Sequence, residues 1–197
     1  MTKLIIQYYI QSCLLRFKIS RHRLLYLAFG AAAFLIAYSA GAAFPMGHEE
    51  AETLRREFSR QIEGIDQNGI FLNNIRIALV MFIPAVGVAF GAFSGFSTGS
   101  IFSALSSSSP ALSRVPPLII LITPFGIMEV FVYALAISRS GMLIYYLLKK
   151  RHWRKYAIPT LIEVSIAIGV LFVAAVIEWQ MIEQLGGLDA GIAIEPV

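Results

Sequence analysis

One carboxylate, Glu129, lies within an apolar run from Pro116 to Leu148. An ionisable side chain at membrane depth is costly and usually has a function. Pro124 and Gly126, which come just before it, predict a break in the helix that carries it, and membrane proteins build polar sites at such breaks. Glu129 is therefore a candidate proton carrier or ion ligand. The alternative, which we favour, is that it accepts hydrogen bonds from neighbouring helices and holds the fold together.

Four other polar residues are expected at membrane depth. Asn73 and Asn74 follow each other near the start of an apolar segment, and consecutive helix positions point about 100° apart, so both cannot face one partner. One of them is expected to bridge to the helix of Glu129. Arg139 and Glu163 are expected at similar depth on either side of a short basic connection, which predicts an ion pair between them. We expect these residues to stabilise helix packing rather than to bind a ligand.

Composition places the chain among membrane proteins. Its 197 residues are 57% hydrophobic and 14% charged, whereas soluble domains carry about 25% charged residues. The mean hydropathy of +0.72 agrees. We expect an all-α, polytopic bundle that forms a single membrane domain over residues 1–197. The single cysteine, Cys13, excludes an intrachain disulfide and a thiolate metal cluster.

About five transmembrane helices are expected. The apolar segments cover residues 24–44, 70–90, 91–107, 118–148 and 157–178. The fourth is longer than the ~30 Å hydrocarbon core requires, so a break at Pro124–Gly126 would divide it into two half-helices. The third contains much Gly and Ser, and it either spans the membrane or re-enters it. The first exceeds the 7–15 residues typical of a signal-peptide core, so we expect an uncleaved anchor.

Glycines recur every four residues through the middle of the chain. Small residues at this spacing allow helices to pack closely, backbone against backbone. The glycines expected to do so are Gly87, Gly91, Gly95 and Gly99.

The distribution of charge predicts the orientation. Residues 1–23 and 149–155 carry Lys and Arg but no acid, which is typical of cytoplasmic segments, whereas residues 45–68 are mixed and acidic. We expect a cytoplasmic N-terminus, an external amphipathic helix within 45–68 and an external tail over 184–197. Residues 1–23 are expected to form an interfacial helix, or alternatively a frayed leader. Because positive-inside bias accounts for the basic segments, we expect no nucleic-acid partner.

Two motifs in this order resemble a known family. Phe71-Leu72-Asn73-Asn74 is similar to an F-x-N-N element, and Pro124–Glu129 is similar to a P-H-G-x-x-E element, with a Gly-rich stretch between them. Together they resemble the stage II sporulation protein M family over roughly residues 20–182. Phe125 replaces the usual His of that family, which leaves a His–Glu proton or metal pair without its His. The resemblance implies an integral membrane protein of the cell envelope. The founding member is a scaffold that holds together a complex with a membrane-anchored peptidoglycan hydrolase, and relatives occur in organisms that make no spores.

We therefore expect a non-enzymatic scaffold or accessory subunit of a cell-envelope complex, embedded in the lipid bilayer beside other envelope proteins. The sequence contains no Walker loop, nucleophile elbow, zincin motif or dinucleotide-binding fingerprint. We accordingly expect no cofactor, metal site or catalytic residue. The alternative is a small ion- or proton-coupled transporter or channel-like protein that uses Glu129 in a broken helix. Such a protein would need to form a homo-oligomer, because five helices leave little room for a lumen.

Overall fold

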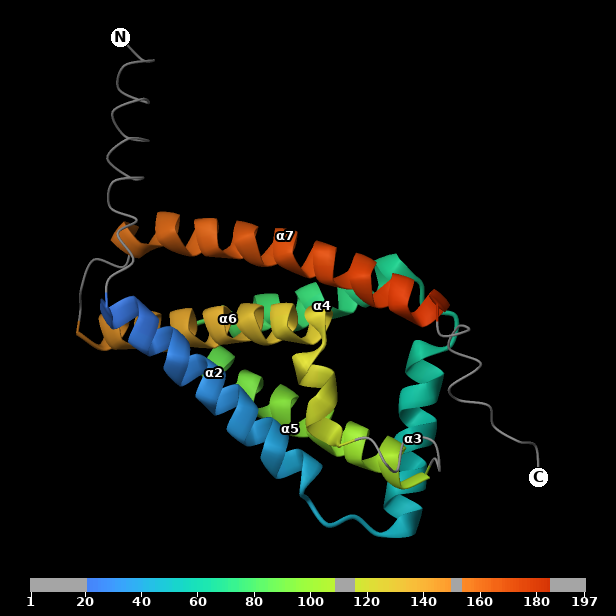
Figure 1. The fold of residues 1–197 in the computed structure, drawn as a ribbon. Helices are drawn as coiled ribbons and strands as arrows, with labels where there is room; N and C mark the ends of the chain where they lie inside the picture. The colour runs from blue at the N-terminus through green and yellow to red at the C-terminus, as the bar shows by residue number, and fades with distance from the viewer. Residues whose placement is uncertain (1–20, 109–115, 150–153, 185–197) are drawn as a thin grey trace.

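The computed structural model describes residues 21–108, 116–149 and 154–184, which are all helical and contain no strand (Figure 1). Of the interfacial helix expected over residues 1–23, residues 1–20 lie outside these ranges, as do residues 185–197 of the tail expected over 184–197. The elements are α2 (Arg21–Ala42), α3 (His48–Ile62), α4 (Gln67–Met81), α5 (Val86–Ser108), the 3-10 helix η1 (Pro117–Ile122), α6 (Pro124–Leu148) and α7 (Arg154–Gln184).

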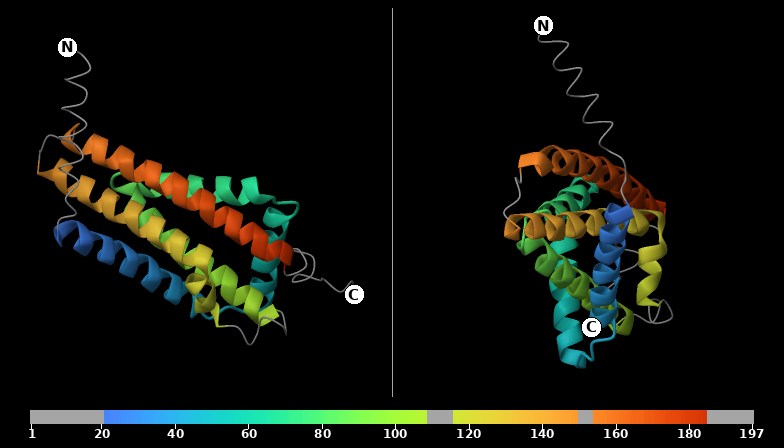
Figure 2. Two further views of the ribbon diagram at one scale, coloured as in Figure 1. Left: turned by 45° about the horizontal axis from the view of Figure 1, so that its top comes forward. Right: turned by 90° about the vertical axis from the view of Figure 1, so that its left-hand side faces the viewer.

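Helix α6 forms the centre of the bundle, and the other long helices surround it (Figures 1 and 2). It packs against α2, α4, α5, α7 and η1. Every residue from Val132 to Ser140 is buried, so this stretch of α6 is covered on all sides. A helix that is apolar all round is expected in the middle of a bundle. Helix α3 differs from the rest because it lies across one end of the bundle (Figure 1).

Among the described residues, four helices are long and apolar enough to cross a membrane. They are His22–Ala42, Val86–Ser107, Pro124–Leu148 and Tyr156–Gln184. The protein is therefore a membrane-embedded helical bundle. Helix α4 has 15 residues and extends about 22 Å, which is less than the ~30 Å hydrocarbon core. The expected total of five spans stays a prediction.

The expected segment 70–90 is divided in two. Helix α4 ends at Met81, and Ala85 adopts a left-handed conformation with φ 69° before α5 begins. Pro84 accounts for the position of this turn, because proline cannot donate the hydrogen bond that would continue a helix. Gly87 allows the turn to close, since a Cβ atom there would collide with the backbone carbonyl of Met81. The Gly-rich residues 91–107 thus belong to one continuous helix, α5.

Pro124 begins a helix instead of interrupting one. Thr123 has an extended backbone, and its hydroxyl accepts a hydrogen bond from the Gly126 N–H at 3.1 Å, which makes it the N-cap of α6. Threonine at the N-cap followed by proline is a favoured helix start. The two half-helices expected around Pro124–Gly126 are therefore replaced by a six-residue 3-10 helix, Pro117–Ile122, and an unbroken helix of 25 residues.

Glycines hold α2 and α5 in close contact. A Cβ atom on Gly99 would collide with the backbone of Tyr38 and Ala42, and one on Gly41 would collide with the backbone of Phe96. Two further glycines of α5 also face neighbouring side chains and backbone. They are Gly91, against Ile137, and Gly95, against Phe34. This contact through small residues is the kind expected from their spacing.

We predict that Gly99→Ala lowers the stability of the protein in detergent. The added methyl group has no space, and overpacking of this kind costs about 1–3 kcal/mol. Thermal unfolding of the purified protein measures the effect. Gly169→Ala on α7 is the control, because a Cβ atom there meets nothing within 4 Å. Since alanine favours a helix more than glycine does, the control should be no less stable than wild type. Equal stability of both variants would contradict the close packing of α2 on α5.

Candidate functional site

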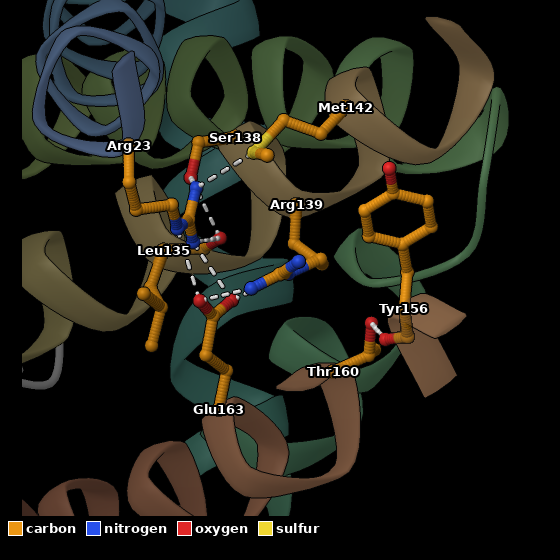
Figure 3. A network of polar contacts seen from close by, with 8 residues as sticks. All are labelled: Arg23, Leu135, Ser138, Arg139, Met142, Tyr156, Thr160 and Glu163. Carbon is orange, nitrogen blue, oxygen red and sulfur yellow. Dashed lines mark hydrogen bonds and ion pairs between the residues drawn. The ribbon is translucent and has the colours of Figure 1, made fainter. Parts of the chain in front are cut away.

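Two groups of polar side chains lie among the apolar helices. The first, which we call the arginine cluster, consists of Arg23, Ser138, Arg139 and Glu163. It joins three helices, because Arg23 belongs to α2, Ser138 and Arg139 to α6, and Glu163 to α7. Figure 3 shows the two guanidinium groups converging on the Glu163 carboxylate from different sides. The structure thus contains the ion pair between Arg139 and Glu163 that the sequence analysis expected.

Both oxygens of Glu163 accept from both arginines. Arg23 donates from Nε to Oε1 at 2.9 Å and from Nη2 to Oε2 at 2.7 Å. Arg139 donates from Nε to Oε2 at 2.7 Å and from Nη2 to Oε1. Such two-point contacts between a guanidinium and a carboxylate are among the strongest hydrogen bonds in proteins. The single carboxylate therefore holds both arginines in fixed orientations.

Ser138 ties the arginine cluster to the backbone of α6. Its hydroxyl accepts a hydrogen bond from Arg23 Nη1 at 2.7 Å and donates to the Leu135 carbonyl at 2.8 Å. The Leu135 carbonyl also accepts from Arg23 Nη2 at 3.4 Å. The Arg23 side chain is 15% exposed, and those of Arg139 and Glu163 are 5% and 6% exposed. Removing one partner of so well buried a pair typically costs about 3–5 kcal/mol.

Arg23 is the member that sequence reasoning missed. The sequence analysis counted it only as part of the basic segment before the first span. In the structure Arg23 is the third residue of α2, and its side chain reaches inward to Glu163, which is 140 positions further along the chain. Its place at the very start of an apolar helix was the available signal, because a long side chain there can reach either the membrane surface or the bundle interior.

The second group, the asparagine cluster, consists of Asn74, Glu129 and Tyr133. The Asn74 side chain donates from Nδ2 to Glu129 Oε1 at 2.5 Å. Its Oδ1 atom accepts a hydrogen bond from the Tyr133 hydroxyl at 3.3 Å. Glu129 and Tyr133 are four residues apart on α6 and share one face of that helix. Asn74 therefore connects α4 to α6 through both ends of its side-chain amide.

Only one of the two consecutive asparagines makes this bridge, as the helix geometry required. Asn74 is 9% exposed, whereas Asn73 is exposed and donates only a long hydrogen bond, 3.5 Å, to Asn74 Oδ1. Asn73 thus lies at the edge of the asparagine cluster. The bridge to Glu129 comes from Asn74.

Glu178 on α7 is a second residue that sequence reasoning missed. The sequence analysis used it only to mark the end of the last apolar segment. In the structure Glu178 lies on α7, the helix that packs against both α4 and α6. Its Oε2 atom is buried and has no hydrogen-bond partner within the described ranges. A second acid in an apolar segment was the signal that could have drawn attention to it.

Two hollows accompany these clusters, and neither is lined by their residues. One, of about 420 Å³, lies on α3 beside Glu49, Glu50, Thr53, Leu54 and Glu57. The other, of about 340 Å³, lies beside Pro84 and the ends of α6 and α7 that face each other. Among the described residues, no three His, Cys, Asp or Glu side chains are placed to hold a metal ion. In both clusters the polar side chains form hydrogen bonds with one another, and neither cluster lines one of these hollows.

A comparison with models of protein families gives a match over most of the chain. The family model for stage II sporulation protein M matches residues 24–179, which is most of the chain. The chain belongs to the stage II sporulation protein M family. The match contains α3 to α6 entire and nearly all of α2 and α7, together with Asn74, Glu129, Arg139, Glu163 and Glu178. No curated protein and no solved structure matches the chain.

We predict that Glu163→Gln destabilises the protein more than Arg139→Gln. The first change leaves two buried cations without a carboxylate, whereas the second leaves Arg23 and Glu163 as a pair. By the cost of breaking a buried ion pair, Glu163→Gln should lower the free energy of unfolding by about 3–5 kcal/mol. Unfolding in mixed detergent micelles measures both variants. The double variant should recover part of the loss, because it buries one cation fewer.

Glu183→Gln is the matched control, since Glu183 is an exposed acid on the same helix. It should unfold like wild type. Equal losses for Glu163→Gln and Arg139→Gln, or a double variant less stable than either, would show that the two arginines do not share one carboxylate.

Proposed function

We propose that this protein is a non-enzymatic scaffold or accessory subunit of a cell-envelope complex. The observation that carries the proposal is helix α3, which lies across one end of the membrane bundle and carries an acidic hollow (Figure 1). Membership of the stage II sporulation protein M family supports the same function. The partner would be another membrane or envelope protein that contacts α3.

The packing of α3 supports a role as a docking surface. The helix contacts α5, and Ala51 is buried while Leu54 and Phe58 are partly buried. The same helix exposes Glu49 and Glu57 beside the hollow. One side of α3 therefore attaches it to the bundle, and a charged side is left for a partner.

Ion pairs within α3 involve some of its charged side chains and leave others without a partner on the helix. Glu52 accepts a hydrogen bond from Arg56 at 2.8 Å and forms an ion pair with Arg55 at 3.5 Å. The hydrogen bond from Arg56 holds the pKa of the Glu52 carboxyl below its usual range. Two of the basic residues of α3 are thus directed to Glu52. Glu49 and Glu57, the acids beside the hollow, form no ion pair with a described residue, and a basic partner surface would complement them.

The proposal includes five crossings with the N-terminus cytoplasmic and the C-terminus external. Helix α4 would be the fifth crossing, although it is short. The charge pattern supports this proposal, because the basic segments 1–23 and 149–155 fit the cytoplasmic side and the acidic segment 45–68 fits the outside. The turn after α4 packs against α6, where the Ser140 hydroxyl donates to the Ile83 carbonyl at 2.7 Å and so gives this backbone group a partner. This orientation places α3 outside the cell.

The polar side chains within the membrane form hydrogen bonds and ion pairs between helices, which supports a structural role for them. Asn74 holds Glu129, and Glu163 holds both arginines, so each of these hydrogen bonds joins two helices. A carboxylate that carries ions must exchange its partners during transport, whereas these contacts fix the helices in place. Binding energy for a partner would then come from α3.

A second candidate function, ion or proton passage, rests on Glu178. Its buried Oε2 atom has no hydrogen-bond partner among the described residues. Acidic side chains at membrane depth are typical of proton pathways. Under this alternative Glu129 and Glu178 would exchange a proton within a homo-oligomer.

We predict that reversing the charge of the hollow on α3 removes the partner. The double variant Glu49→Lys, Glu57→Lys should reduce recovery of any co-purifying subunit several-fold, because like charges across an interface repel. Affinity purification of the tagged protein from its native membrane, followed by quantitative mass spectrometry, measures the recovery. Glu63→Lys is the control, since Glu63 is exposed at the end of α3 but does not line the hollow. Unchanged recovery with the double variant would exclude this surface as the docking site.

We also predict that Glu129→Gln leaves both stability and partner recovery at wild-type levels. Glutamine keeps the carbonyl oxygen that accepts from Asn74, so the bridge to α4 survives. Glu129→Leu should instead lower the free energy of unfolding by about 1–3 kcal/mol, because the buried Asn74 amide loses its acceptor. Thermal unfolding and proton flux into liposomes test both variants. A proton flux in wild type that Glu129→Gln abolishes without loss of stability would favour the second candidate function.

A further inference from the structure

Arg76 places a positive charge on the outer face of α4. The buried residues of this helix are Ile70, Asn74, Ile75, Ala78 and Met81. Arg76 follows Asn74 by two positions, so the two side chains point about 200° apart around the helix. Arg76 is exposed and forms no hydrogen bond or ion pair with any residue that the structure describes. It therefore faces the surroundings of the bundle and not its interior.

The surface around Arg76 is apolar except for one amide. Leu72 and Leu79 are 47% and 42% exposed, and they lie within about one turn of Arg76 along α4. Asn73, three positions before Arg76, is exposed as well. One of its two amide N–H groups donates the 3.5 Å hydrogen bond to Asn74 Oδ1, which leaves the other for a ligand. A guanidinium and an amide N–H one helical turn apart together suit a group with anionic oxygens.

Arg76 lies within reach of the membrane surface. The chain is polar where α4 begins, because Glu63, Asp66 and Asn68 are all exposed. Arg76 is eight positions beyond Asn68, which is about 12 Å along the helix. Long side chains on a helix lean toward its N-terminal end. An arginine can lay its stem on apolar surface while its charge reaches the polar layer, where the lipid phosphates lie.

The short length of α4 brings the lipid phosphates closer to Arg76. With 15 residues the helix extends about 22 Å, less than the ~30 Å hydrocarbon core. A bilayer accommodates a short exposed helix by becoming thinner around it, which lowers the phosphate layer toward the helix centre. The length of α4 and the charge on its outer face therefore favour the same ligand.

We propose that Arg76 and Asn73 bind the phosphate of one phospholipid on the outer face of α4. The guanidinium donates two hydrogen bonds to the phosphate oxygens, and the Asn73 amide donates a third. The acyl chains lie against the exposed leucines of the same face. The bound phosphate would hold the bilayer thin along α4. This site is independent of the scaffold proposal, because it requires no other protein.

Native mass spectrometry of the full-length protein in mild detergent measures the binding. Titration with dioleoylphosphatidylglycerol is compared with titration with dioleoylglycerol, which has the same acyl chains but no phosphate. Wild type should bind the first phosphatidylglycerol several-fold more tightly than dioleoylglycerol. Arg76→Gln should weaken phosphatidylglycerol binding about fivefold, the effect of one basic residue near an anionic headgroup, and leave dioleoylglycerol binding unchanged. Asn73→Ala should weaken it less, because the amide carries no charge.

Arg60→Gln is the matched control. Arg60 is an exposed arginine in the last turn of α3, and it forms no ion pair with any described residue. This variant should bind both lipids as wild type does. Arg76→Lys, which keeps the positive charge, should retain most of the binding. If Arg76→Gln does not give a monodisperse protein, Arg76→Leu removes the same charge and serves instead.

Four results would overturn the proposal. Equal affinity of wild type for the two lipids would show that the phosphate is not recognised. Equal weakening by Arg60→Gln would indicate a general effect of charge instead of a site. Displacement of the lipid by millimolar inorganic phosphate would indicate a site for the free anion. Phosphatidylglycerol binding that Arg76→Gln leaves unchanged would exclude Arg76, and loss of a co-purifying subunit in that variant would assign Arg76 to a partner's carboxylate.

Discussion

The carboxylate of Glu163 is the contact on which the arrangement of the helices depends. It accepts hydrogen bonds from Arg23 on α2 and from Arg139 on α6, and it belongs to α7. Three charged side chains at membrane depth are tolerated only when they meet, because each would be costly to bury alone. Arg23 and Glu163, which are 140 positions apart along the chain, must therefore converge at one point. The apolar faces alone would allow several arrangements, whereas the arginine cluster selects one.

The central position of α6 follows from the same requirement. It carries members of both clusters, and its serines extend their reach, since Ser138 holds Arg23 and Ser140 holds the turn after α4. Towards the other end of α6, Glu129 and Tyr133 hold Asn74 of α4. The glycines of α5 allow α2 to pack closely against α5. Polar contacts thus orient the helices around α6, and small residues determine how closely they pack. Helix α3 contributes no residue to either cluster.

Much of this could be predicted from the sequence, for identifiable reasons. Arg139 and Glu163 lie at similar distances along the chain from the basic segment 149–155, and this was enough to predict that they form an ion pair. Consecutive helix residues point about 100° apart, and this was enough to predict that only one of Asn73 and Asn74 reaches Glu129. The contributions of Arg23 and Glu178 depend on which helices become neighbours, and nothing local in the sequence states that. Proline in an apolar run predicts a break within a helix, whereas Pro124 is the first residue of α6. Thr123 at the N-cap makes the same proline a helix start.

We propose that the polar side chains within the membrane serve the fold and that function lies in contacts with other subunits. The decisive measurement is native mass spectrometry of the protein purified from its own membrane in mild detergent. One recurring foreign subunit at a fixed stoichiometry with this chain is the expected result. A lone monomer or a homo-oligomer, recovered under conditions that keep other envelope complexes intact, would contradict it.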